Sequence, residues 1–246
     1  MSEAQFDVYA SGYDTALNQG LSLSGESKEF FASARVRWLA DRLAEWNARP
    51  ARVLDFGCGT GGTSPVLLQT LHAREVLGID PSPDMVAVAR RAHDHPRLSF
   101  STTDEMPDDG TFDLAYCNGV FHHIPPAQRA ETLARIHASL SVGGYLAFWE
   151  NNPWNPGTRL VMSRIPFDRD AVLLSPPHAR ALLRRSGFRV LRTDFLFLFP
   201  RQLAFLRPLE RRVASIPAGA QYEVLCQKVA WPEAEPYSRR PEAEPR

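Results

Sequence analysis

The chain has 246 residues, of which 44% are hydrophobic, so it is long enough and apolar enough for one large domain with a substantial core. Its 28 lysines and arginines balance its 28 aspartates and glutamates, and this neutral charge gives no reason to expect a nucleic-acid partner. The three cysteines show neither disulfide nor zinc-ligand spacing, so no metal site is predicted.

Residues 1–49 are predicted to form an N-terminal lid and helix. Residues 5–25 carry aromatic and polar side chains with little periodicity. From Glu26 to Trp46, apolar residues recur at helical spacing, and the Arg49-Pro50 pair ends the predicted helix.

A buried strand runs directly into a glycine-rich turn at Val53-Leu54-Asp55-Phe56-Gly57-Cys58-Gly59-Thr60-Gly61-Gly62. A helix with apolar residues on one side follows. This strand, glycine loop and helix are typical of the start of a doubly wound α/β sheet, which binds ligands at the carboxyl ends of its strands. Glycines there allow positive φ angles and close approach of a ligand to the backbone.

The spacing of the loop allows two kinds of cofactor. Gly57, Gly59 and Gly62 formally fit the dinucleotide fingerprint, and Asp80 follows at a distance suited to a ribose contact. Asp55 argues against a dinucleotide, because its carboxylate would repel a pyrophosphate at the helix N-terminus. The same carboxylate would attract the amino group of S-adenosylmethionine (SAM), which carries no phosphate.

Five ordered segments resemble class I SAM-dependent methyltransferases, specifically the small-molecule group that includes the ubiquinone/menaquinone-type enzymes. They are Asp55–Gly61, Glu75–Ser82, Thr103–Pro107, Phe112–Pro125 and Leu140–Phe148. The resemblance implies a Rossmann-like, seven-stranded, mostly parallel sheet, doubly wound with helices on both faces. It also implies a SAM-binding core at residues 50–150, a substrate-pocket insertion, last helix and final strands at 151–230, and a disordered tail at 231–246.

The resemblance further implies a set of cofactor contacts. Asp55 would hold the amino group, Asp80 both ribose hydroxyls, and Asp104 the adenine amino group, with Glu105 or Met106 sharing the last role. The sulfonium region would be lined by backbone carbonyls of Asn118 and Gly119. The remaining residues that this resemblance places at the cofactor are Gly57, Cys58, Gly59 and Gly61 in the loop, Pro81 and Met85 after the second strand, and Tyr13, which with Tyr9 belongs to a segment that folds over SAM.

The candidate catalytic residues are His122, His123 and Glu150. The two histidines are an adjacent titratable pair near the expected methyl group, and either could take a proton from an acceptor. A capping or packing role for the pair is equally open. Glu150, just after the expected fifth strand, is the second candidate base.

The region after the core is expected to shape the acceptor pocket. Turn formers dominate 151–175, a helix begins at Ser175 and ends at Gly187, and strands are predicted at Phe188–Phe199 and Ala220–Lys228. Aromatic residues of this region either line an apolar pocket or, where they alternate on a strand, form a core face. They are Trp154, Phe167, Phe195, Phe197 and Phe199.

The function predicted from these features is methyl transfer from SAM to a small-molecule acceptor by direct in-line displacement, with an oxygen or nitrogen acceptor favoured over carbon. The motif of amino-methylating relatives is absent after the fourth strand, where Cys117-Asn118-Gly119-Val120 stands. The alternatives are a methyltransferase for RNA or protein and a non-catalytic SAM-binding regulatory subunit. No signal peptide or membrane span is evident, so a cytoplasmic protein is expected, of open oligomeric state.

Overall fold

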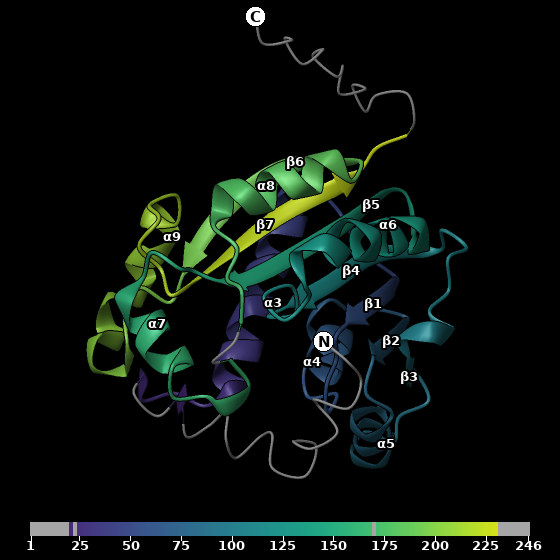
Figure 1. Cartoon of the computed structure of the whole chain (residues 1–246), viewed down its shortest axis with the longest axis horizontal. Helices are drawn as coiled ribbons and strands as arrows, with labels where there is room; N and C mark the ends of the chain where they lie inside the picture. The colour runs from purple at the N-terminus through teal and green to yellow at the C-terminus, as the bar shows by residue number, and fades with distance from the viewer. Residues whose placement is uncertain (1–19, 22–23, 169–170, 231–246) are drawn as a thin grey trace, which may run out of the picture.

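A seven-stranded sheet forms the centre of the computed structural model, which describes residues 20–21, 24–168 and 171–230 (Figure 1). The strand order is β3-β2-β1-β4-β5-β7-β6, with only β7 antiparallel to its neighbours. This arrangement confirms the predicted doubly wound, mostly parallel α/β fold. The strands are β1 Arg52–Phe56, β2 Glu75–Asp80, β3 Leu98–Thr102, β4 Phe112–Asn118, β5 Leu140–Asn151, β6 Phe188–Leu196 and β7 Gln221–Lys228.

Helices follow most strands. They are α3 Lys28–Glu45, α4 Ser64–Thr70, α5 Pro83–Ala92, α6 Arg129–Ser139, α7 Pro156–Met162, α8 Pro176–Arg185 and α9 Glu210–Val213. Short 3₁₀ turns occupy η2 Thr103–Glu105, η3 Pro126–Gln128, η4 Pro166–Asp168 and η5 Arg201–Leu209. The helix predicted from residue 26 to 46 is therefore confirmed as α3, whose Ser27 hydroxyl caps the first turn by accepting from the Phe30 N–H.

Successive side chains of a strand point to opposite faces of the sheet, where they belong to two different hydrophobic cores. Leu114 and Tyr116 of β4 face the side covered by α3 and α4, whereas Ala115 and Cys117 face the side covered by α6 and α8. Both faces of a parallel strand are thus buried, which explains its nearly continuous apolar sequence. Within the described residues, no helix combines the length and the apolar character needed to cross a membrane.

β2 and β3 are added on one side of β1, and β4 and β5 are added on the other side. Doubly wound folds bind ligands at this switch point between β1 and β4. The carboxyl ends of β1, β2, β4 and β5 lie at one edge. β7 runs the other way, so its first residue, Gln221, pairs with Asn151 at the end of β5 and lies at the same edge. That edge carries the candidate site.

One of the predicted element boundaries is wrong. The strand expected to reach Phe199 ends at Leu196, because its partner β7 begins opposite it at Gln221. Phe197 then adopts a left-handed conformation with φ 61°, which breaks the alternation expected for the three phenylalanines. The helix start predicted at Ser175 is confirmed, because Ser175 directly precedes α8, although its side chain makes no capping hydrogen bond.

Candidate functional site

The glycine loop after β1 has the backbone that its sequence predicts. Gly57, Gly59 and Gly61 have φ angles of 75°, 53° and 80°, which side chains with a Cβ rarely adopt. A Cβ on Gly57 would lie 2.3 Å from the Val120 side chain, whereas one on Gly59 would meet nothing within 4 Å. The loop is therefore closely packed at its base and open at Gly59.

Asp80, at the end of β2, ties this loop to the next strand. One carboxylate oxygen accepts from the Gly59 N–H at 2.9 Å and the other from the Ser82 N–H at 3.0 Å. The neighbouring Pro81 is exposed and Met85 is buried in α5. Asp80 thus lies beside the open part of the loop, where the predicted ribose contact requires it.

Asp55 is buried beneath the loop, and its carboxylate accepts from the Ser64 hydroxyl at 2.7 Å. Burial raises the pKa of Asp55 to about 7, Ser64 opposes the rise, and the nearby Asp80 adds to it. A cationic group bound beside Asp55 would favour its ionised form. Burial also raises the pKa of the Cys58 thiol well above its usual value, so this thiol is neutral.

The predicted adenine contacts lie on η2, directly after β3. Asp104 and Glu105 are exposed, and Glu105 accepts from the Ser101 hydroxyl. Met106 is buried among core residues. Of these three predicted contacts, Asp104 and Glu105 present carboxylates to solvent, while Met106 offers only an apolar side chain.

Asn118 and Gly119 end β4 at the switch point. The Gly119 N–H donates to the Trp149 carbonyl at 3.0 Å, and Gly119 has a φ of 67°. The side-chain oxygen of Asn118 is buried and has no hydrogen-bond partner among the described residues. A buried polar atom without a partner is costly, so this oxygen indicates a place for a bound hydrogen-bond donor. Tyr13 and Tyr9 lie outside the described residues.

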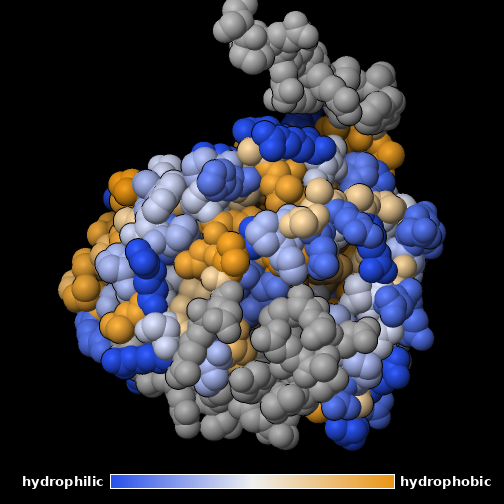
Figure 2. Space-filling view, in the orientation of Figure 1, coloured by the Kyte–Doolittle hydropathy of each residue, from blue (hydrophilic) through white to orange (hydrophobic). Residues whose placement is uncertain are grey.

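A cavity of about 490 Å³ adjoins Asn118 and Gly119. One part of its lining is apolar: Leu21, Phe30, Phe31, Leu160, Val161, Met162, Ile165, Phe167, Phe197, Leu198 and Phe199. Its polar part includes Lys28, Arg35, His122, His123, Asn151, Asp168, Arg207 and Gln221. Apolar side chains also gather on the outer surface over α7 and η5 (Figure 2), which carry the exposed Leu160, Leu203 and Phe205.

The aromatic residues of the later region divide between cavity and core. Phe197 packs edge-to-face on Phe31 with ring centroids 4.8 Å apart, and Phe199 and Phe167 also line the cavity. Phe195 is buried against Tyr222 in the core. Trp154 is half exposed and lies outside the cavity lining.

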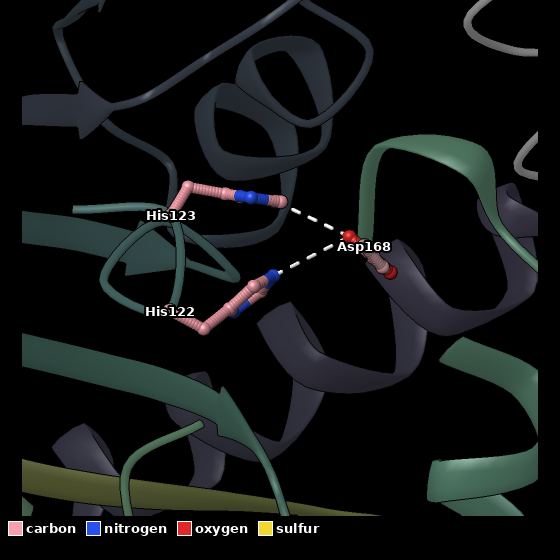
Figure 3. Close-up of side chains that lie close together, drawn as sticks. All are labelled: His122, His123 and Asp168. Carbon is pink, nitrogen blue, oxygen red and sulfur yellow. Dashed lines mark ion pairs between the residues drawn. The ribbon is translucent and has the colours of Figure 1, made fainter. Parts of the chain in front are cut away.

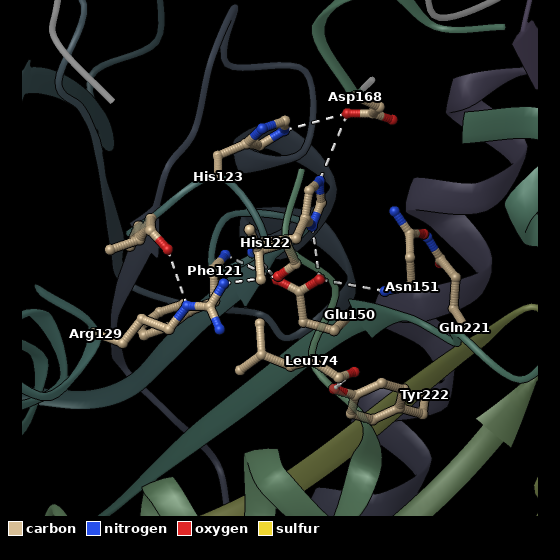
Figure 4. A network of polar contacts seen from close by, with 12 residues as sticks. Phe121, His122, His123, Arg129, Glu150, Asn151, Asp168, Leu174, Gln221 and Tyr222 are labelled. Carbon is tan, nitrogen blue, oxygen red and sulfur yellow. Dashed lines mark hydrogen bonds and ion pairs between the residues drawn. The ribbon is translucent and has the colours of Figure 1, made fainter. Parts of the chain in front are cut away.

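Glu150 holds the loop after β4 in place (Figure 4). One of its oxygens accepts from the N–H groups of Phe121 and His122, at 2.8 and 3.2 Å. The other lies 2.7 Å from His122 Nδ1, and both side chains are buried. Glu150 therefore fixes the orientation of the His122 ring and leaves Nε2 directed away from it.

Asp168 of η4 meets both histidines from the opposite side (Figure 3). Its Oδ1 lies 3.2 Å from His123 Nε2 and 3.6 Å from His122 Nε2. Burial alone would lower the pKa of His122, but Glu150 and Asp168 outweigh it and raise that pKa to about 10. Burial lowers the pKa of His123 despite Asp168, so the two adjacent histidines have different charge states.

A second polar network crosses the far side of the cavity. The Arg35 guanidinium of α3 donates to the Tyr116 hydroxyl and to the Gln221 side-chain oxygen, each at 3.0 Å. The Gln221 amide donates in turn to the Asn151 side-chain oxygen at 3.1 Å. These contacts join α3, β4, β5 and β7 at the edge of the sheet.

The methyltransferase domain family matches residues 53–144, which include the glycine loop, Asp80, Asn118 and the two histidines. This stretch is similar to a methyltransferase domain. The match and the fold both agree with the predicted class I SAM-dependent methyltransferase, and SAM stays the predicted cofactor. The match does not reach the insertion after β5.

Curated relatives carry methyltransferase names. A trans-aconitate 2-methyltransferase of Methylobacterium nodulans is 37% identical over 135 residues, covering 53% of this chain and 51% of the relative. One of Deinococcus radiodurans is 39% identical over 118 residues, covering 48% and 45%. The chain spans about half the length of the curated relatives it matches.

Solved structures share the fold at low sequence identity. An S-adenosylmethionine-dependent methyltransferase from Mesorhizobium loti aligns with a TM-score of 0.54 and 22% identity, covering 76% of this chain and 96% of that one. Magnesium protoporphyrin IX methyltransferase from Synechocystis, with bound S-adenosylhomocysteine (SAH), aligns with a TM-score of 0.58 and 20% identity, covering 85% and 86%.

Sequence analysis missed three residues that the structure brings to the site: Asp168, Arg35 and Gln221. Asp168 lies 45 or more residues from the histidines it contacts, in a segment without periodicity. Arg35 lies on a helix whose apolar spacing predicts which face packs on the core but gives no signal for Arg35 itself. No local pattern marks Gln221, which becomes part of the site only because β7 is antiparallel.

Proposed function

We propose that this chain transfers a methyl group from SAM to a small organic acceptor that binds in the cavity beside β4 and β5. The observation that carries the proposal is the position of the cavity, which adjoins Asn118 and Gly119 at the end of the methyltransferase domain's fourth strand. A reacting group in this cavity would lie next to the predicted sulfonium position. The ubiquinone/menaquinone-type subgroup is part of the proposal and is supported by the five sequence segments.

The residues on the cofactor side fit SAM. Asp55 offers a carboxylate whose ionised form a bound ammonium group would stabilise, and Asp80 lies beside the open Gly59. The unpartnered Asn118 oxygen can accept one hydrogen bond. SAM supplies a methyl group on a positively charged sulfur, which makes the thioether a good leaving group, so the protein is not required to generate an electrophile.

Alignment is then the main task of the chain. Holding nucleophile, methyl carbon and sulfur in line is worth roughly 7–11 kcal/mol. Apolar side chains from α3, α7 and the segment after β6 line the cavity at this position. We propose an oxygen or nitrogen acceptor ahead of carbon, because neither needs a carbon–hydrogen bond to be broken.

The acceptor proposed first is a small carboxylic acid. The names of the curated relatives point to trans-aconitate, and the cavity here combines apolar walls with Lys28, Arg35 and Arg207. Cationic side chains attract carboxylates, while the apolar walls suit a carbon skeleton.

His122, His123 and Glu150 are proposed to act on the acceptor side. Glu150 has no exposed surface and its oxygens are occupied by His122 and by backbone N–H groups, so we assign it a positioning role. His122 and His123 line the cavity itself. Replacing each histidine by Asn tests its role. If the role is structural, turnover stays within about tenfold of wild type; if the side chain acts directly, turnover falls about 100-fold or more at unchanged SAH affinity.

The test begins with calorimetric titration of the purified protein with SAH and with NAD⁺, followed by an assay of SAH release from SAM. Trans-aconitate, other small carboxylic acids, phenols and amines serve as acceptors, with RNA and protein extracts as the competing classes. Micromolar SAH binding with acceptor-dependent release from a small molecule supports the proposal. Methylation of RNA or protein alone, or SAH binding without any acceptor, would overturn it.

A further inference from the structure

Three potential metal ligands converge on one wall of the cavity (Figure 3). His122 and His123 come from the loop after β4, and Asp168 comes from η4, in the insertion that follows β5. One ligand atom from each lies within 4.8 Å of the other two. The Asp168 oxygen is 3.2 Å and 3.6 Å from the two Nε2 atoms.

The two distances from the Asp168 oxygen match those between ligands around one metal ion. Two ligand atoms about 2.1 Å from an ion lie about 3.0 Å apart at a right angle and about 3.4 Å apart at the tetrahedral angle. A set of two imidazoles and one carboxylate suits zinc or a neighbouring first-row transition metal. Magnesium and calcium prefer oxygen ligands, so they fit this set poorly.

Glu150 supplies the outer contact that metal-bound histidines usually make. Its carboxylate accepts from His122 Nδ1 at 2.7 Å, which leaves Nε2 directed at Asp168 and able to bind an ion that displaces its proton. The same carboxylate is fixed by the Phe121 and His122 N–H groups, so the ring has little freedom to turn. His122 is thereby preorganised as a ligand.

Charge balance points the same way. Glu150 and Asp168 are both buried carboxylates. Within the described part of the chain, their ion pairs are all with the imidazoles of His122 and His123. A divalent ion with two neutral imidazoles would neutralise both carboxylates. Without it, the cluster requires a proton on an imidazole to avoid leaving two buried negative charges.

We propose that His122, His123 and Asp168 bind a divalent first-row transition metal ion whose remaining coordination positions face the cavity. Resting on the proposed function, the ion would hold an oxygen atom of the acceptor close to Asn118 and Gly119. It would also lower the pKa of a bound hydroxyl or orient a bound carboxylate. The metal ion and the cofactor would then contact the acceptor from two sides.

The experiment measures metal binding without SAM or acceptor, so its outcome is independent of the proposed activity. Untagged protein, freed of metal with a chelator, is titrated with Zn²⁺ by calorimetry and with Co²⁺ by visible absorption. We expect one saturable equivalent per chain, and a cobalt spectrum of nitrogen and oxygen ligands without a thiolate charge-transfer band. The absence of that band separates this site from Cys58.

Variants locate the site. His123→Ala and Asp168→Asn are expected to weaken Zn²⁺ binding about 100-fold or more, and Glu150→Gln about 10- to 100-fold, because it loosens His122. The matched control is His178→Ala, which removes an exposed histidine of α8 outside the cluster and should bind as wild type. SAH affinity of each variant reports whether it is folded.

The proposal is overturned if wild-type protein binds SAH but takes up no saturable equivalent of Zn²⁺ or Co²⁺. It is overturned equally if Asp168→Asn and His123→Ala bind the ion as tightly as wild type. In either case the cluster is a hydrogen-bonded proton relay without metal. Metal binding in a protein that does not bind SAH would support the site and contradict the proposed function.

Discussion

The cofactor side and the acceptor side of this site are built in different ways. On the cofactor side, Asp80 and the loop glycines lie at the ends of adjacent strands, and their contacts run mainly to backbone N–H groups. On the acceptor side, side chains meet side chains across long stretches of sequence: His123 with Asp168, and Arg35 with Gln221, which are 186 residues apart.

The family match reflects this difference in part, because it contains the glycine loop and the two histidines but ends before Asp168 and Gln221. Backbone-mediated contacts need a particular loop shape, which a short glycine motif encodes, and the matched domain at 53–144 contains that motif. Contacts between distant side chains can be replaced pair by pair while the sheet stays intact. The glycine loop therefore lies within the family match, whereas Asp168, Arg35 and Gln221 lie outside it.

The largest effect is expected where the two sides join, at Glu150. Glu150→Gln removes the charged partner of the buried His122, and loss of one member of a buried pair costs roughly 3 kcal/mol or more. The free energy of unfolding, measured with urea in the presence of chelator, should fall by about this amount.

Glu223→Gln is the matched control for that variant. Glu223 is also buried on a strand, but burial and the neighbouring Asp194 raise the pKa of its carboxyl well above the usual value, so the substitution changes no charge. Equal losses of stability in both variants would contradict the special role of the Glu150–His122 pair.

Asp80→Ala should act on the cofactor side alone. It removes two hydrogen bonds that fix the loop and the predicted ribose contact, so we expect SAH affinity to fall about 100-fold. Calorimetry measures the change. Asp84→Ala, an exposed carboxylate in the first turn of α5, serves as control and should bind SAH within about twofold of wild type.

The pKa of Asp55 makes SAH binding depend on pH. The folded protein without cofactor holds Asp55 partly protonated near its pKa of about 7, and the bound ammonium group favours the ionised form. Binding therefore releases a proton, and affinity should rise about tenfold from pH 6 to pH 8. Asp55→Asn should remove this rise; an unchanged pH profile would contradict the contact.

The same shift has the opposite consequence for the protein without cofactor. Because the pKa of Asp55 is raised above its unfolded value, its contribution to stability is complete below pH 4 and is lost as the pH rises through 7. Urea unfolding of wild type and Asp55→Asn across this range separates this effect from binding.

The smallest expected effect concerns Phe197, on the acceptor side. Phe197 has a φ of 61°, so Phe197→Gly should leave the protein about 1 kcal/mol more stable than Phe197→Ala, although both lack the ring. The ring packs on Phe31 and lines the cavity that we assign to the acceptor. Both variants should therefore keep the SAH affinity of wild type. Equal stability of the two would mean that the backbone relaxes when the ring is removed.

The sequence by itself predicted the sheet, the glycine loop and SAM as the cofactor. Each depends on residues that are close in the chain or that end consecutive strands: the positive φ angles of Gly57 and Gly59, the carboxylate of Asp55, and the alternation of β4 and β5. Local backbone preference and hydrophobic periodicity act over a few residues, so they remain visible without the tertiary structure.

Only the tertiary structure decided what surrounds the acceptor. Asp168 reaches the histidines because the insertion folds back over the carboxyl edge, and Gln221 reaches Arg35 because β7 runs antiparallel. Phe197 leaves its strand because β7 offers no further partner. Such contacts depend on where the whole chain places distant segments, and neither spacing nor composition carries that information.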